Sequence, residues 1–367
     1  MNRRSAAFSL VELMIALAIV MTVLYAAINF FIVSVRQYKV QTKITETNVE
    51  GLLGLELLRQ DLECLGFGLP WNNLPATYTE RTGVNAAIVA LTDAPNAPRP
   101  VLSINAPTFT HNNSDYLVIK SARVAMSDAA GKWTTLTQAN AKRTWTPPGE
   151  NLANTDYVIV LALGSTDNNR RSLVNPGTFY TTYNSTSGYV PLEPYSANIV
   201  YGIDSAVPPV RPFNRADYFI DNTAVPQRCA PHTGVLVKAV VAHDASGTTP
   251  TLLPLLDCVA DMQVVYGLDN NADGTPDAWS SDISAGMSAA DIRTQVAEVF
   301  VHILAQEGQR DDSYVYPYDN AVVGPVQGRT FNFSSYGFTS SGNVASNFKH
   351  YRWKVYNIVV KPKNLAN

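Results

Sequence analysis

The strongest pattern in the chain is a run of apolar residues near its N-terminus. Residues 8–35 read FSLVELMIALAIVMTVLYAAINFFIVSV, and Glu12 is the one charged residue in the run. A membrane-spanning helix needs about 20 consecutive apolar residues. The run is therefore long enough to cross a bilayer, and we predict a transmembrane helix over residues 8–35.

Beyond this run the apolar residues become periodic. Between residues 36 and 66 they recur every three or four positions without an intervening proline, which is typical of a helix with one apolar face. The apolar positions are Val40, Ile44, Leu52, Leu55, Leu58, Leu62 and Leu65. We predict one continuous helix that lays this face on a sheet and ends near Gly66, where further glycine and a proline follow. The charged residues left to solvent are Arg36, Lys39, Lys43, Glu46 and Arg59.

The helix also contains Gly51 and Gly54. Each glycine weakens a helix by about 1 kcal/mol relative to alanine. Burial of the apolar face must therefore compensate for both.

The rest of the chain, residues 67–367, carries the short strand signals of a loop-rich β domain. In its first half we predict wrapping loops with at most one or two short strands over 71–113, surface loops over 129–154 and 164–194, and short strands at 116–120, 157–163, 199–203 and 218–220. In its second half we predict a hairpin of 234–243 with 251–256, strands at 259–268, 294–304 and 351–361, and a short helix at 289–293.

The leader MNRRSAA, residues 1–7, fixes the orientation of the predicted anchor. Arg3 and Arg4 place the N-terminus in the cytoplasm by the positive-inside bias, so residues after about 35 are exported. A secretory signal would have a shorter apolar region followed by small residues at a cleavage site. In this chain the small residues Ala6 and Ala7 precede the apolar run instead.

This arrangement of basic leader, small residue and FSLVEL resembles the class III signal of type IV prepilins and pseudopilins. The resemblance implies cleavage between Ala7 and Phe8 by a prepilin peptidase, methylation of the new Phe8 amine, and an assembly role for Glu12. The family usually has glycine where this chain has Ala7. Glu12 lies one helical turn from the new amine, so we expect its carboxylate to pair with that amine or with one on a neighbouring subunit and to set subunit register.

The C-terminal sequence sharpens the resemblance. LLDCVADMQVVYGLDNNADGTPDAW, the strand at 296–304 and YRWKVYNIVVKPKN are similar to the C-terminal half of PilW-type minor pilins. The resemblance implies an α+β pilin fold in which the transmembrane helix (8–35) and its amphipathic continuation (36–66) pack on an antiparallel sheet of a periplasmic domain (67–367), expanded by long loops.

The same resemblance implies a minor pilin that primes pilus assembly and sits at or near the pilus tip. Its partners would be other minor and major pilins, prepilin peptidase and the inner membrane, with the domain on the pilus or cell surface after assembly. The alternatives are a minor pseudopilin of type II secretion and a tip adhesin with binding loops in 71–230. A membrane-anchored enzyme is a further alternative, which requires converging titratable groups.

Composition and motifs argue against two classes of function, nucleic-acid binding and catalysis. The 367 residues carry a net charge of −3 and form no basic stripe, so we expect no nucleic-acid partner. The five histidines never occur at metal-ligand spacing, and no nucleophile elbow, phosphate loop or zinc-protease motif is present. We therefore expect no catalytic site.

One stretch resembles a calcium loop. Asp269, Asn271, Asp273, Thr275 and Asp277 supply oxygen ligands at the first alternate positions of such a loop, and Gly274 permits its sharp turn. Ser280 stands where a calcium loop has its bidentate glutamate, which predicts weak calcium binding. The alternative is an Asx-rich hairpin turn without an ion; calcium should raise the melting temperature only in the first case.

Three cysteines lie in the exported part of the chain, where disulfides form. Cys229 and Cys258 flank the predicted hairpin, so we predict a disulfide between them. Cys64 is left over as a small apolar residue at the helix end. Pairings that involve Cys64 stay open as the alternative.

Overall fold

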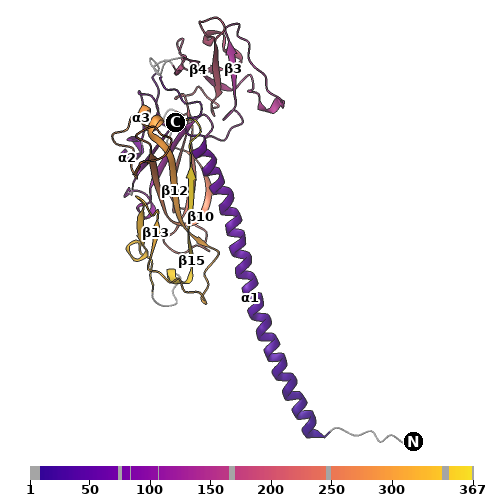
Figure 1. The fold of residues 1–367 in the computed structure, drawn as a ribbon. Helices are drawn as coiled ribbons and strands as arrows, with labels where there is room; N and C mark the ends of the chain where they lie inside the picture. The colour runs from indigo at the N-terminus through magenta and orange to yellow at the C-terminus, as the bar shows by residue number, and fades with distance from the viewer. Residues whose placement is uncertain are drawn as a thin grey trace, which may run out of the picture.

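The computed structural model describes residues 9–72, 77–82, 84–105, 107–164, 170–244, 249–340 and 347–365. Its longest element is helix α1 (Leu10–Glu63), which extends far beyond the β domain toward the N-terminus (Figure 1). The β domain lies against the C-terminal half of this helix. The predicted combination of a long helix and an antiparallel sheet is therefore confirmed.

Helix α1 has 54 residues, which at 1.5 Å per residue gives a length of about 80 Å. Cys64 caps its C-terminal end, and Gly66 then adopts a left-handed φ of 72°. Within the part of the chain that the structure describes, α1 is the one helix long and apolar enough to cross a membrane, and none of its most apolar 18-residue window is buried.

The main sheet is antiparallel and contains eight strands, with the order β1-β2-β8-β9-β10-β12-β15 and β11 paired to β10. These strands are β1 (Val101–Ile104), β2 (Tyr116–Ser121), β8 (Asn214–Asp221), β9 (Gly234–Val241), β10 (Thr251–Leu268), β11 (Ala278–Ser280), β12 (Val296–Glu307) and β15 (Arg352–Val360). Helix α3 (Ala289–Gln295) leads into β12, and β13 (Asn320–Val323) pairs with β14 (Arg329–Asn332). The predicted C-terminal hairpin, short helix and last two strands are confirmed.

Strand β10 differs from the prediction in one respect. We expected two strands, 251–256 and 259–268, but β10 runs through both. Its pairing with β9 shifts register between Pro254 and Leu256 and again between Leu256 and Val259. Cys258 has a φ of 58° in this irregular stretch. The strand therefore kinks where two separate strands were predicted, because β-bulges allow extra residues without ending the ladder.

A second, five-stranded sheet lies near the C-terminal end of α1, at the end of the molecule far from the N-terminus (Figure 1). Its strands are β3 (Trp133–Thr137), β4 (Tyr157–Leu163), β5 (Arg170–Leu173), β6 (Thr181–Thr182) and β7 (Ala197–Gly202). The predicted strands at 157–163 and 199–203 belong to it. The prediction of loops over 129–154 and 164–194 is wrong where β3, β5 and β6 form, because these strands are short and rich in polar residues. In the described part of 71–113 the single short strand β1 agrees with the prediction, whereas the four-residue helix α2 (Ala86–Val89) was not predicted.

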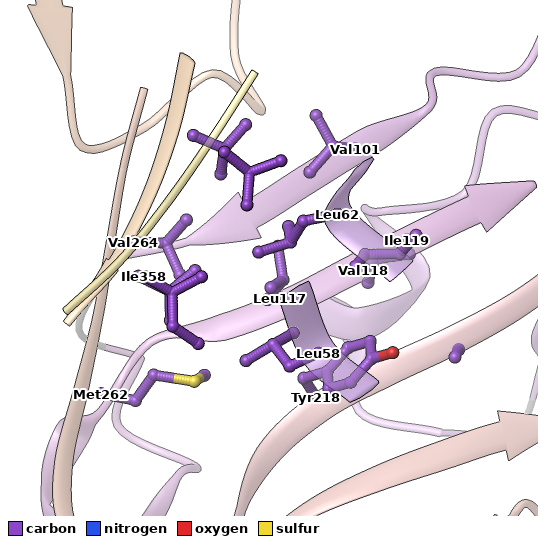
Figure 2. Close-up of a cluster of buried hydrophobic side chains, with 14 of the residues drawn as sticks. Leu58, Leu62, Val101, Leu117, Val118, Ile119, Tyr218, Met262, Val264 and Ile358 are labelled. Atoms are coloured by element: carbon purple, nitrogen blue, oxygen red, sulfur yellow. The ribbon is translucent and has the colours of Figure 1, made fainter. Parts of the chain in front are cut away.

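The C-terminal end of α1 forms part of the main core. Leu55, Leu58, Leu62 and Leu65 are buried in one cluster with side chains of the main sheet, and Figure 2 shows Leu58 and Leu62 beside residues from several strands. The prediction for Leu52 is wrong, since 62% of this residue is exposed.

The two helix glycines allow α1 to approach β10 closely. A Cβ atom added to Gly54 would lie 1.8 Å from the carbonyl oxygen of Leu255, and one added to Gly51 would lie 2.8 Å from a methyl group of Leu256. Backbone atoms cannot move aside as a flexible side chain can. The predicted cost of Gly54 in helix propensity is therefore linked to a backbone contact that no larger residue permits, whereas Gly51 faces a side chain that can move.

We expect Gly54→Ala to destabilise the domain although alanine favours helices by about 1 kcal/mol. The new methyl group would overlap the Leu255 carbonyl, and overpacking of this kind costs about 1–3 kcal/mol. Gly51→Ala should have a smaller effect, because Leu256 can rotate. Urea unfolding of the full chain in detergent measures both, with the exposed Gln41→Ala as control. A more stable Gly54→Ala variant would show that α1 is not seated as described.

Candidate functional site

The predicted processing site lies at the start of α1. Ala7 and Phe8 fall outside the described residues, so the structure does not test cleavage or methylation there. The first described residue, Ser9, is the N-cap of α1 and has an extended conformation. The helix therefore begins two residues after the predicted cleavage point.

Glu12 and Ser9 form a reciprocal capping box. The backbone N–H of Ser9 donates to Glu12 Oε2 at 3.1 Å, and the backbone N–H of Glu12 donates to Ser9 Oγ at 3.2 Å. Such a pair satisfies two of the N–H groups that a helix leaves free at its start. In this arrangement the Glu12 carboxylate is directed toward the N-terminal end of its own helix, and its pairing with the Phe8 amine stays a prediction.

The N-terminal half of α1 is an apolar surface without cover from its own domain. Most large apolar residues from Leu10 to Val33 are more than half exposed, and Phe30 reaches 76%. Exposed apolar surface on this scale indicates a membrane or another protein as its partner. The C-terminal end of α1 is therefore covered by its own domain, whereas its N-terminal half must be covered by a membrane or by another protein.

A buried polar group fixes α1 on the sheet. Lys238 Nζ, on β9, lies 2.6 Å from Asp61 Oδ2, and the hydroxyl of Tyr218, on β8, donates to the same oxygen. Asp61 is 7% exposed. Burial raises the pKa of its carboxyl group, against the opposing effects of Lys238 and Tyr218. Sequence reasoning missed this group, although an aspartate three residues after Leu58 lies on the buried face of the helix.

The predicted cysteine pair lies beside the helix seat, the contact of Gly51 and Gly54 of α1 with Leu255 and Leu256 of β10. Cys229 and Cys258 form a disulfide with Cα atoms 4.9 Å apart, and Cys64 is free and half-buried. An ion pair of 2.7 Å between Arg228 and Asp257 joins the same two segments. Cys258 belongs to the irregular stretch of β10 that contacts α1, so the disulfide braces the sheet just where the helix packs.

A second polar network fastens the segment 77–99 to the other face of the main sheet. Lys120, on β2, pairs with Glu80 at 2.8 Å and also with Asp93, while Arg99 pairs with Asp93. Lys120 is fully buried. Because Lys120, Glu80 and Asp93 are buried and Arg99 is only partly exposed, the network holds a segment that has little secondary structure of its own.

Arg215 and Asp217, on β8, continue this network. Arg215 lies 3.0 Å from Glu80 and 2.7 Å from Asp217, and Arg81 reaches Asp217 at 2.8 Å. Tyr218 faces α1, so its neighbour Asp217 points to the opposite face of the sheet. Alternating polar residues such as Arg215 and Asp217 normally indicate a solvent-facing side, so their burial cannot be recognised from the local pattern.

The predicted calcium loop is closed by its own hydrogen bonds. Asp269 accepts from the backbone N–H groups of Asp273 and Gly274, at 3.2 and 2.7 Å, and Asp273 accepts from that of Thr275 at 2.8 Å. Asp277 accepts from Asn270.

Among the described residues no group of three or more His, Cys, Asp and Glu side chains is arranged to hold a metal ion. The carboxylates of Asp269, Asp273 and Asp277 are therefore not gathered around one point in this structure. Calcium binding stays a prediction, and it requires these carboxylates to exchange their backbone donors for the ion.

Comparison with known families gives two matches. Residues 217–364 match the family model of type IV pilus-assembly protein W, and residues 2–28 match the prokaryotic N-terminal methylation motif. No curated protein and no solved structure matches the chain. The two matches agree with the resemblances at both ends of the sequence and with the pilin-like α+β fold; the second sheet lies outside both.

The buried network predicts how stability depends on pH. Burial would raise the pKa of Asp217, but Arg215 and Arg81 outweigh it and hold the pKa below the ordinary 3.8; Lys120 and Arg99 have the same net effect on Asp93. A lowered pKa stabilises the folded state above the unfolded value, and this contribution is lost as pH falls through the folded value. We therefore expect the free energy of unfolding to drop steeply below about pH 4.

Urea unfolding between pH 7 and pH 3 measures this dependence. Asp217→Asn should lower the free energy of unfolding at pH 7 by about 3–5 kcal/mol, the usual cost of breaking a buried ion pair. It should also reduce the fall of that free energy between pH 5 and pH 3, which we call the acid limb. Asp93→Asn provides a second test if the first variant does not fold. Asp128→Asn, whose side chain is 96% exposed, is the control. An acid limb of unchanged slope in both buried variants would contradict this role of the network.

Proposed function

We propose that this chain, which is similar to type IV pilus-assembly protein W over residues 217–364 and to the N-terminal methylation motif over residues 2–28, is a minor pilin that primes assembly of a type IV pilus. The observation that carries this proposal is the division of α1. Its C-terminal end is part of the domain core, whereas its N-terminal half is apolar and exposed. Such a helix can leave the bilayer and enter a helical bundle of other subunits without unfolding its own domain.

In this proposal the cytoplasmic leader is removed by prepilin peptidase between Ala7 and Phe8, and the new amine is methylated. The domain lies in the periplasm until assembly and on the pilus afterwards. Other minor and major pilins are its partners. The family is a structural component of pilus assembly, and we expect neither catalysis nor nucleic-acid binding.

The second sheet supports a position at or near the pilus tip. It lies beyond the seated end of α1, farthest from the helix half that would enter the filament (Figure 1). A subunit stacked above this one would have to accommodate that sheet. We therefore place the protein where no further subunit is added, which makes it a starting unit for the filament.

Adhesion through residues 71–230 is the second candidate function. In the loop before β7, Leu192 is 92% exposed and Tyr195 is fully exposed with a φ of 64°. Exposed apolar side chains at the far end of the molecule favour contact with a surface or partner. A minor pseudopilin of type II secretion is the third candidate, and it is the weaker one because the matched family is a pilus component.

Deletion of the gene, with surface pili counted by electron microscopy, tests the priming role. We expect the deletion to remove most pili and the wild-type gene to restore them. Glu12→Gln should restore fewer, because the uncharged side chain cannot pair with the amine of Phe8 or of a neighbouring subunit. Glu46→Gln, which removes an exposed carboxylate farther along the same helix, is the matched control.

Normal numbers of normally retracting pili in the deletion strain would contradict priming. Loss of protein secretion with intact pili would favour the pseudopilin alternative. Intact pili that no longer attach to surfaces would favour the adhesin.

A further inference from the structure

The domain returns to α1 at the point where the apolar run ends. Two hollows lie there, and residues of the loop after β12 and of β15 line them together with the helix. The predicted transmembrane segment ends at Val35, so these hollows lie at the level where the helix leaves the bilayer. They are separate from the helix seat, which lies farther along α1.

The first hollow has an apolar wall and a cationic rim. It has a volume of about 350 Å³ and is lined by Phe31, Ile32, Val35, Arg36, Lys39, Val40 and Gln309. Because residues four apart stack on one side of a helix, Phe31 and Val35 continue directly into Lys39. An apolar stripe that ends in a cation is complementary to a phospholipid: the apolar side chains match the acyl chain, and the cation matches the phosphate.

The second hollow supplies an additional cation from the sheet. It has a volume of about 630 Å³, and its lining includes Arg36, Asp311, Ser313 and Arg352. Arg352 bonds to Asp311 through Nη2 at 3.0 Å, and its guanidinium lies 4.1 Å from the ring centre of Tyr314. Its Nη1 atom is buried and has no hydrogen-bond partner among the described residues. The side chain as a whole is 30% exposed, so its guanidinium adds a positive charge beside the second hollow.

The two helix cations are not held in ion pairs. Arg36 and Lys39 are exposed, and neither forms an ion pair within the described part of the chain; Arg36 acts on Asp311 only through space, as one of the charges that lower the pKa of that carboxyl group. Lys43, one turn farther on, is paired with Glu46 at 2.6 Å. The unpaired cations are therefore those next to the end of the apolar run, where a bilayer presents its phosphates.

We propose that these hollows bind an anionic phospholipid of the leaflet from which α1 emerges. Its acyl chain lies along Phe31 and Val35, and its phosphate is held by Arg36 and Lys39, with the guanidinium of Arg352 adding to the positive charge. This inference rests on the membrane-anchored state in the proposed function. The bound lipid fixes the depth of the helix and the orientation of the domain on the bilayer before assembly.

Lipid titration of the purified full-length protein tests the proposal. Short-chain phosphatidylglycerol is added in a neutral detergent, and bound lipid is measured by native mass spectrometry. Phosphatidylcholine and inorganic phosphate are tested in parallel. One cation near a membrane surface contributes about fivefold to lipid affinity, so Arg36→Gln with Lys39→Gln should weaken phosphatidylglycerol binding about thirtyfold. Arg352→Gln should weaken it about fivefold.

The double variant Lys43→Gln with Arg59→Gln removes the same net charge outside the hollows, and it should bind as the wild type does. The proposal is overturned if Arg36→Gln with Lys39→Gln binds phosphatidylglycerol normally, or if phosphatidylcholine binds equally well. It is also overturned if inorganic phosphate competes as effectively as the lipid. Binding of phosphatidylglycerol only when another pilin is added would overturn it as well. Pilus counts are independent of this assay, so failure of lipid binding leaves the priming role standing.

Discussion

The close approach of α1 to β10 is the contact on which the rest of the structure depends. Gly54 leaves room for the Leu255 carbonyl, and this contact brings Leu58 and Leu62 into the core. The helix then has one acceptable rotation, because Asp61 must meet Lys238. A slip of one residue would bury a carboxylate without its cation, which costs more than the apolar contacts can offset. Because the helix is fixed rigidly on the sheet, the position of its exposed half determines the position of the whole domain.

The long, strongly periodic elements could be predicted from sequence. The apolar run, the amphipathic helix and the strands of the C-terminal half each repeat one pattern over many residues, so local and tertiary preferences agree. Leu52 shows the limit of such counting. At 100° per residue, Gly51 and not Leu52 lies on the buried face with Leu55 and Leu58, and a glycine leaves no apolar signal. From the sequence, the helix glycines were therefore interpreted only as a loss of helix propensity, and not as the residues that contact β10.

The second sheet and the buried charges could not be predicted. Strands such as β3 have few residues and alternate polar with apolar side chains only briefly, so they cannot be told from turns. Lys120 and Asp217 are stabilised by partners far away in sequence, and no local pattern reveals such pairing. At the candidate processing site the sequence singles out Glu12 for pairing with the Phe8 amine, which stays a prediction, whereas the capping of Glu12 by Ser9 is visible only from the structure.

The central claim is that one helix serves two environments, with its last turns built into the domain and its first half outside it. Hydrogen–deuterium exchange of the full-length protein in lipid nanodiscs tests this most directly. The account predicts that amides of residues 55–63 exchange as slowly as those of β10, that residues 10–35 are protected by the bilayer, and that residues 36–47 between them exchange faster. Equal and rapid exchange over 36–63 would show that the helix is not seated on the sheet and would contradict the account.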